Sequence, residues 1–275
     1  MAEPLPVVDA TGHAGFWHDA PRQVLTAVEF DVLWERLGLG VTPVALRLPS
    51  PGRTQGERRD VIASGWQALR DRGLAGPAGP DPELARMLRL LARPAAQLEL
   101  RANWGRSVRA LAAGSPGAGV LAVRQDATVT LGPCGSLPSG LLSVLPAAGP
   151  GPGQAASVPT AALASALTPA GVGLRTALLG QDVDAEEAAL LARMLGLVAG
   201  RAQIVALAAD RWGVARRAGG VVGVLDGPRG RYLMTRSAGD DGTEWTTVAP
   251  TDRRRLHHRV AELLDHATLA AAPMA

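Results

Sequence analysis

The chain has 275 residues, of which 47% are hydrophobic, and its formal net charge is +3. This length allows one large domain or two small ones with a sizeable core. All 28 basic residues are arginine, which we attribute to GC-rich coding, and 3% of the residues are aromatic. These values favour a globular protein and give no indication of a nucleic-acid partner. The single cysteine, Cys134, excludes an intrachain disulfide and a cysteine-based zinc cluster.

The start of the chain is rich in Pro, Gly and Ala without a period, so we expect residues 1–21 to be a disordered segment. It has neither the basic region nor the apolar run of a signal peptide. No apolar run elsewhere approaches the length needed to span a bilayer. We therefore predict a cytoplasmic protein without membrane insertion.

Residues 22–145 are predicted to form an N-terminal half of helices and antiparallel strands. Thr26 and Glu29 have the spacing of a capping box, which predicts a helix that begins there. The apolar run at 44–48 is a candidate strand, and residues 55–72 are predicted to form a second helix. Three strand candidates with short connections then form an antiparallel meander, at 107–114, 119–125 and 128–132.

A unit of helix followed by strand occurs twice. The stretch ARMLRLLARPAAQLELRANWG at 85–105 returns as ARMLGLVAGRAQIVALAADRWG at 192–213, and both copies contain a closing Trp-Gly. Each copy places four apolar residues on one helix face, namely Leu84, Met87, Leu88 and Leu91, and Leu191, Met194, Leu195 and Val198. Asp81 and Asp184 are in position to cap the two helices. We infer an internal duplication, with chance resemblance between two amphipathic helices as the alternative.

The Gly/Pro-rich stretch at 146–157 is predicted to be a flexible linker between the halves. Residues 158–268 form the C-terminal half, with a second meander at 221–226, 231–237 and 245–249 and a final helix capped by Thr251. Because neither copy of the repeated unit can bury its apolar face alone, we expect the two halves to share one sheet as a single domain. The predicted fold is α/β of the α+β type, a central antiparallel sheet flanked by helical bundles in two pseudo-twofold-related halves.

Few residues are candidates for catalysis or metal binding. His13 and His18 lie near Asp9 and Asp19, but their spacing is not that of a zinc motif. The sequence contains no GxSxG, HExxH or Walker pattern, and Cys134 has no local signature of an activated thiol. We therefore expect no catalytic residue, metal, cofactor or small-molecule substrate. An enzyme with catalytic residues scattered through the sequence is a less favoured alternative.

Three blocks, in this order, resemble the EspG family of type VII (ESX) secretion-associated proteins: FDVLWERLGLGVTPVALRLPSPGRTQGERRDVIASGWQALRDRGL, PDPELARMLRLLARPAAQLELR and GVLDGPRGRYLMTRSAGDDGTEWTTVAP. The resemblance covers about residues 22–266. It implies a cytosolic chaperone that binds the helical tip of the PPE partner in PE–PPE heterodimers and keeps this client soluble for export. It implies neither catalysis nor a cofactor.

In similar proteins the client contact uses the sheet, the loop after the first long strand of the meander and the C-terminal helical bundle. That loop corresponds here to residues 103–107 and is shorter than in several family members. Aromatic and arginine side chains dominate interface energetics, so Trp104 and Arg106 are candidates for partner binding, although Trp104 could equally cover the edge of the core. The candidates in the second half are Trp212, Arg229 and Arg231. A structural or self-associating protein of the same fold, with homo-oligomers, is the alternative function.

Overall fold

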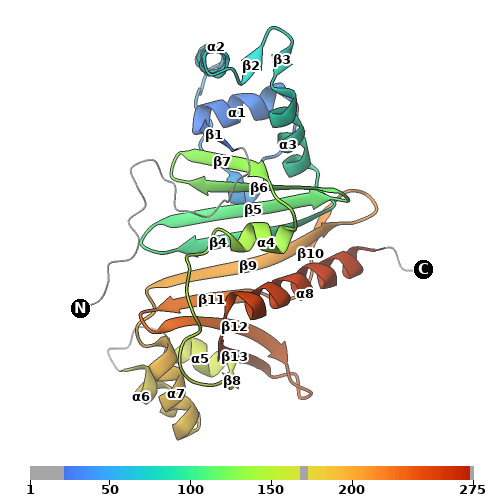
Figure 1. Ribbon diagram of the computed structural model, residues 1–275. Coiled ribbons are helices and arrows are strands. Elements are labelled where there is room, and N and C mark those ends of the chain that lie inside the picture. The colour runs from blue at the N-terminus through green and yellow to red at the C-terminus, as the bar shows by residue number, and fades with distance from the viewer. Residues whose placement is uncertain (1–21, 168–172, 273–275) are drawn as a thin grey trace.

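One antiparallel sheet extends through the computed structural model, which describes residues 22–167 and 173–272 (Figure 1). Its strand order is β1-β7-β6-β5-β4-β9-β11-β12-β13-β8, and β10 pairs with β9 beside this path. The strands are β1 (Gln23–Thr26), β4 (Ala96–Asn103), β5 (Ser107–Ser115), β6 (Ala118–Gln125), β7 (Thr128–Pro133), β8 (Ala156–Pro159), β9 (Gly200–Ala209), β10 (Ala215–Arg217), β11 (Val222–Gly227), β12 (Gly230–Ala238) and β13 (Glu244–Pro250). The two predicted meanders are confirmed.

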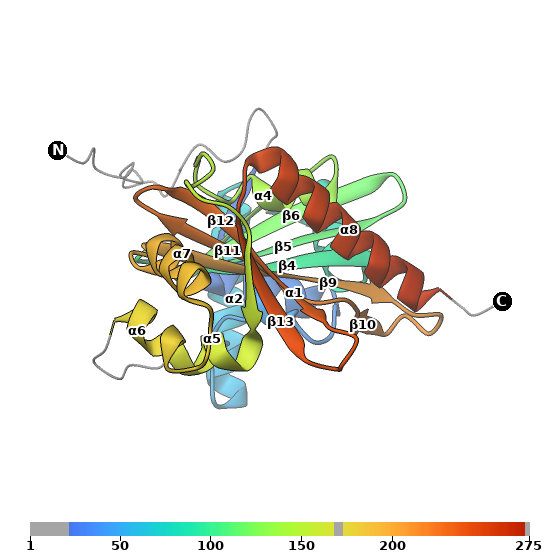
Figure 2. The same cartoon turned by 90° about the horizontal axis from the view of Figure 1, so that it is seen from below.

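Helices cover both faces of this sheet (Figures 1 and 2). They are α1 (Ala27–Arg36), α2 (Gln55–Asp71), α3 (Pro82–Ala92), α4 (Leu137–Leu142), α5 (Thr160–Ala166), α6 (Leu174–Leu179), α7 (Ala185–Leu195) and α8 (Arg253–Ala271). The first bundle, α1 to α3, shares a core with β5, β6 and β7. The second bundle, α5 to α7, shares one with β8, β12 and β13. Helices α4 and α8 pack against the central strands.

Strand register places the two bundles on the same face. Directly paired residues of neighbouring strands point to one side, and successive residues alternate. Leu111 of the first core pairs with Glu99 on β4, which pairs with Val205 on β9. Tyr232 of the second core pairs with Leu225, which pairs with Arg201 on β9. Residues 201 and 205 share one face, so the even-numbered residues of β9 face α4 and α8 on the other side.

The centre of the sheet is the pairing of β4 with β9. Leu98 lies opposite Ala206. These two residues are as far apart in sequence as Trp104 and Trp212, so they occupy equivalent positions in the two copies of the repeated unit. Outward from this pair, β4-β5-β6-β7-β1 on one side matches β9-β11-β12-β13-β8 on the other. The two halves are therefore pseudo-symmetric, as predicted, and their origin by internal duplication stays a prediction.

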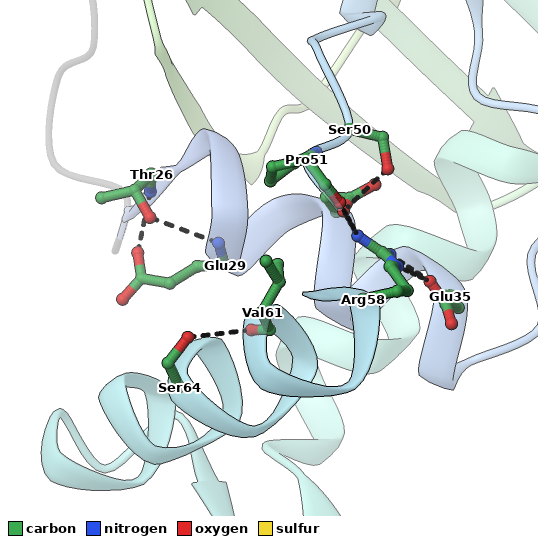
Figure 3. A network of polar contacts seen from close by, with 9 residues as sticks. Thr26, Glu29, Glu35, Ser50, Pro51, Arg58, Val61 and Ser64 are labelled. Atoms are coloured by element: carbon green, nitrogen blue, oxygen red, sulfur yellow. Dashed lines mark hydrogen bonds and ion pairs between the residues drawn. The ribbon is translucent and has the colours of Figure 1, made fainter. Parts of the chain in front are cut away.

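Capping and ion pairs join the elements of the first bundle (Figure 3). The Thr26 hydroxyl accepts from the Glu29 backbone N–H, and Glu29 Oε2 accepts from the Thr26 backbone N–H at 2.8 Å, which confirms the capping box. Burial would raise the pKa of Glu29, but the hydrogen bonds from Thr26 and Arg72 outweigh it and lower that pKa. Arg58 of α2 pairs with Asp31 of α1 and so links the two helices.

Two expectations based on apolar pattern are wrong. The run at 44–48 contains a 3₁₀ turn, Val44–Leu46, in place of a strand. Ala45 and Leu46 of this turn are buried in the first core, and such burial does not require the two-residue period of a strand. In the second repeat the helix ends at Leu195, so Val198 lies beyond it and is 39% exposed. The cap of α8 also differs, because the side chain of Asp252 accepts from the backbone N–H of Arg255.

The Gly/Pro-rich stretch is hydrogen-bonded to β12 over part of its length. Backbone hydrogen bonds join Arg231 to Gly149 and to Gly151, and the Tyr232 hydroxyl donates to the carbonyl of Pro152 at 3.1 Å. A Cβ at Gly151 would lie 2.2 Å from the Tyr232 ring, so this stretch approaches β12 too closely for a larger residue. Residues 149–152 are thus attached to β12, and the predicted flexible linker at 146–157 stays a prediction.

Candidate functional site: a partner-binding surface

The sheet face between the two bundles is open to solvent near one end of β4 and β9. On this face β4 carries Gln97, Glu99 and Arg101, and β9 carries Gln203, Val205 and Leu207. Arg101 and Gln203 are exposed, Val205 and Leu207 are half-buried, and Gln97 is buried. We call these six residues the central strip. It combines aliphatic and hydrogen-bonding side chains on a rigid element, which suits a protein partner.

Glu99 is the acidic member of the central strip. Burial raises the pKa of Glu99, and the positive charges of Arg101, Arg109 and Arg217 oppose this shift. The side-chain amide of Gln97 donates to Glu99 Oε1 at 3.1 Å. The surroundings of this carboxylate are therefore strongly basic, and a second acidic group brought to the strip would be attracted.

Trp104 lies in the turn after β4 and packs on the face of the sheet opposite the central strip. Its indole N–H donates to Asp226 Oδ2 at 3.0 Å, and its ring contacts Gly200, where a Cβ would lie 1.8 Å from Trp104 Cδ1. The side chain is half-buried against the core beneath α8. This contact supports the expectation that Trp104 covers the edge of the core, and a role in partner binding is untested. Arg106, two residues on, is exposed.

Arg231, a predicted partner-binding residue, is buried. Its side chain is 4% exposed, and it pairs with Asp226 through two hydrogen bonds of 2.6 and 2.7 Å. It also donates to the carbonyl of Pro146 at 2.8 Å. A guanidinium buried in this way joins β12, β11 and the Gly/Pro-rich stretch. Sequence reasoning missed this pair, although the predicted hairpin strands end at Asp226 and begin at Arg231 and so place the two residues opposite each other.

Arg229 is exposed at the tip of the β11–β12 hairpin. It borders a cavity of about 260 Å³ together with Arg193, Met194, Leu197 and Pro228. Leu197 is 74% exposed and follows the helix cap at Gly196, so it presents an apolar side chain beside the arginines. Sequence reasoning missed Leu197, although its place one residue after a helix-ending glycine could have indicated it.

Trp212 lies at the opposite end of the sheet from Trp104. Residue 104 follows the end of β4 and residue 212 follows the end of β9, and these strands are antiparallel. Trp212 is 71% exposed, and the guanidinium of Arg211 stacks 3.9 Å from its ring centroid. The predicted partner-binding residues therefore divide into a group of Trp104, Arg106 and Arg229 at one end and Trp212 alone at the other.

Across 22–167 and 173–272 no group of three His, Cys, Asp or Glu residues is placed to hold a metal ion. The candidates His13 and His18 lie outside these ranges. Burial raises the pKa of the Cys134 thiol to about 11, which disfavours the reactive thiolate. A second hollow, of about 340 Å³, is bordered by the ion-paired Asp31, Glu35 and Arg58. None of the described helices is long and apolar enough to cross a membrane.

The fold and this surface define an α+β protein whose exposed features suit protein recognition. Its family follows from comparison with known proteins. A model of the EspG family matches residues 26–262, so the chain belongs to the EspG family.

A solved structure supports the fold. The type VII secretion system chaperone EspG5 of Mycobacterium tuberculosis, determined in complex with the PE25–PPE41 dimer, matches with a TM-score of 0.69. The match has 17% sequence identity and covers 90% of this chain and 96% of that chain. At this identity the similarity establishes the shared fold. A comparison with curated proteins found no match.

Proposed function

We propose that this chain is a cytosolic chaperone of a type VII secretion system. Its client is a PE–PPE heterodimer, which it binds at the helical tip of the PPE partner and presents for export. The observation that carries the proposal is the EspG family match over residues 26–262. The open sheet face between two helical bundles supplies a surface of the right kind for a helical tip.

The mechanism follows from the physical problem of an exposed apolar tip. Such a tip aggregates in water, and covering it removes apolar area from solvent at about 25 cal/mol per Å². Val205 and Leu207 of the central strip and the exposed Leu197 offer apolar contacts. The exposed Gln203 can satisfy a polar backbone group at the end of a helical hairpin. Binding without chemistry is sufficient for this function, and we propose no catalytic activity.

Co-expression tests this proposal. The chain is produced with each PE–PPE pair encoded in its own genome, and complexes are captured by a tag on the chain and sized by light scattering. We expect a stable complex with one copy of each of the three chains. Changing apolar residues at the PPE tip to Arg should abolish the complex, whereas the same change far from the tip should not.

Two outcomes would contradict the proposal. One is that no PE–PPE pair is captured while the chain remains folded. The other is a stable homodimer of the chain that persists at low concentration and excludes the PE–PPE pair, which would favour the self-associating alternative.

A further inference from the structure

Three arginines lie side by side across neighbouring strands on the face that carries the central strip. Arg101 of β4 pairs directly with Arg109 of β5, and Arg109 pairs directly with Arg124 of β6. We call Arg101, Arg109 and Arg124 the arginine row. Like charges directly opposite each other destabilise a sheet, so such a row is unfavourable for folding. The fold contains it nevertheless, which points to a use outside folding.

Among the described residues, no carboxylate forms an ion pair with the arginine row. Arg124 is half-buried and donates to the backbone carbonyl of Arg47. In the described part of the chain no carboxylate lies within ion-pair distance of Arg101 or Arg109, as the ion pairs there involve other residues. Glu99, on the same face, interacts electrostatically with both, but it is a single carboxylate for several arginines. The row therefore retains an excess of positive charge, and a partner can reach it at the exposed Arg101 and the half-buried Arg109.

The spacing of the row suits acidic side chains on a helix. Neighbouring strands lie about 4.8 Å apart, so the three backbone positions extend over about 10 Å. Residues one turn apart on a helix lie about 5.4 Å apart along its axis. Carboxylates at i and i+4 of a helix laid across the strands would therefore each meet an arginine, and guanidinium groups bind carboxylates in pairs of parallel hydrogen bonds.

A nucleic acid fits the rest of the surface less well. The aliphatic Val205 and half-buried Leu207 lie beside the row in the central strip, and no aromatic side chain belongs to the strip for base stacking. The net charge of +3 is also low for attraction to a polyanion. The mixture of aliphatic and arginine side chains favours an amphipathic helix with an acidic edge.

We propose that the arginine row is the specificity-determining part of the client surface and selects a helical segment that carries Asp or Glu one turn apart beside its apolar residues. This inference rests on the proposed function for the identity of the client. The chemistry of the segment follows from the register of the row and can be tested separately.

The first test uses the PE–PPE pair captured in the co-expression experiment. The double variant Arg101→Gln and Arg109→Gln is compared with a control of equal charge, Arg59→Gln and Arg70→Gln, in which both residues are exposed on α2. We expect the row variant to bind at least about tenfold more weakly, with a smaller dependence on salt, and the control to bind as the unmodified chain does. The melting temperature of the row variant should change little, because the repulsion between the paired arginines and their attraction to Glu99 are removed together.

Weaker binding together with partial unfolding of the row variant at the temperature of the assay would assign the arginines a structural role and overturn the inference. Equal binding by both variants would also overturn it, while leaving the chaperone function intact.

The second test does not depend on a PE–PPE client. A fluorescent helical peptide with leucines on one face and Glu at i and i+4 is compared with the same peptide carrying Gln at those positions. We expect the Glu peptide to bind better than the Gln peptide, and this preference to disappear in the row variant. No preference for the Glu peptide would overturn the inference. Tighter binding of a short DNA duplex than of the Glu peptide, lost in the row variant, would assign the row to nucleic acid instead.

Discussion

Trp104 and Trp212 occupy matching places in the two copies of the repeated unit, yet their surroundings differ. The ring of Trp104 covers Gly200, and its indole N–H donates a hydrogen bond to Asp226. Trp212 is 71% exposed, and the guanidinium of Arg211 stacks on its ring. Each tryptophan has an acidic residue and an arginine nearby, Asp226 with Arg231 at one end and Asp210 with Arg216 at the other.

The difference between these two ends is burial. The Arg231 side chain is 4% exposed and that of Arg216 is 63% exposed, although both pair with an aspartate at 3.0 Å or less. An exposed pair contributes little because water screens it, whereas removing one partner of a buried pair leaves an unsolvated charge. Equivalent residue types therefore need not have equivalent roles, and four predictions test this conclusion.

The largest expected effect is that of Asp226→Ala. It leaves the buried Arg231 without its carboxylate and should lower the free energy of unfolding by about 3 kcal/mol or more. The matched change at the other end, Asp210→Ala, should cause a much smaller loss. Denaturant unfolding followed by circular dichroism measures both. Equal losses would show that burial does not distinguish the two pairs.

The next effect in size is that of Gly200→Ala. The new Cβ would lie 1.8 Å from Trp104 Cδ1, so the indole must move away from Asp226. We expect a loss of about 2 kcal/mol, as for an overpacked core. Gly149→Ala, with no atom within 4 Å of its added Cβ, is the control and should change stability by less than about 0.5 kcal/mol. A neutral Gly200→Ala would mean that Trp104 is not fixed against β9.

Trp104→Phe and Trp212→Phe compare the two tryptophans directly. The first removes the hydrogen bond from the indole to Asp226 and should cost about 1 kcal/mol of unfolding free energy. The second alters an exposed ring and should stay within about 0.5 kcal/mol. Thermal unfolding of both variants at one protein concentration gives the comparison. A larger loss for Trp212→Phe would reverse our assignment of the two ends.

The smallest effect concerns Glu99, between the two ends, and depends on pH. Because burial raises its pKa in the folded state, the stability associated with Glu99 is full below about pH 4.5, where the acid is protonated. It is lost as the pH rises through the folded-state pKa. Glu99→Gln mimics the protonated acid, so it should stabilise the protein relative to the unmodified chain more at pH 7 than at pH 4. The same difference at both pH values would contradict a raised pKa.

Much of the fold could be predicted because its signals are local. Thr26 with Glu29, and Asp81 with its following proline, mark helix starts that the structure confirms. Leu84, Met87, Leu88 and Leu91 are all buried, as their spacing predicts. The failures at 44–48 and Val198 also have a local cause, since a short apolar run does not specify its period and Gly196 ends the second helix early.

The candidate surface was less predictable. The resemblance to the EspG family indicated the sheet and the loop at 103–107, but not which side chains are accessible. Residue type alone nominated both Arg229 and Arg231, and the structure exposes the first and buries the second. The arginine row was not predicted, because its residues become neighbours only through strand register. Leu197 was missed although its place after Gly196 is a local signal.

The sequence by itself determined α1, α2, α3, α7 and α8, the two meanders and the repeated unit, since caps, turns and apolar period act over a few residues. It did not predict α4 or α6. The tertiary structure decided which of the arginines are buried, which face each other and which remain open to a partner. Arg101, Arg109 and Arg124 become neighbours only when β4, β5 and β6 pair in one particular register. Register is fixed by burial of the opposite face beneath α4 and α8, which is a property of the whole sheet and not of any one strand.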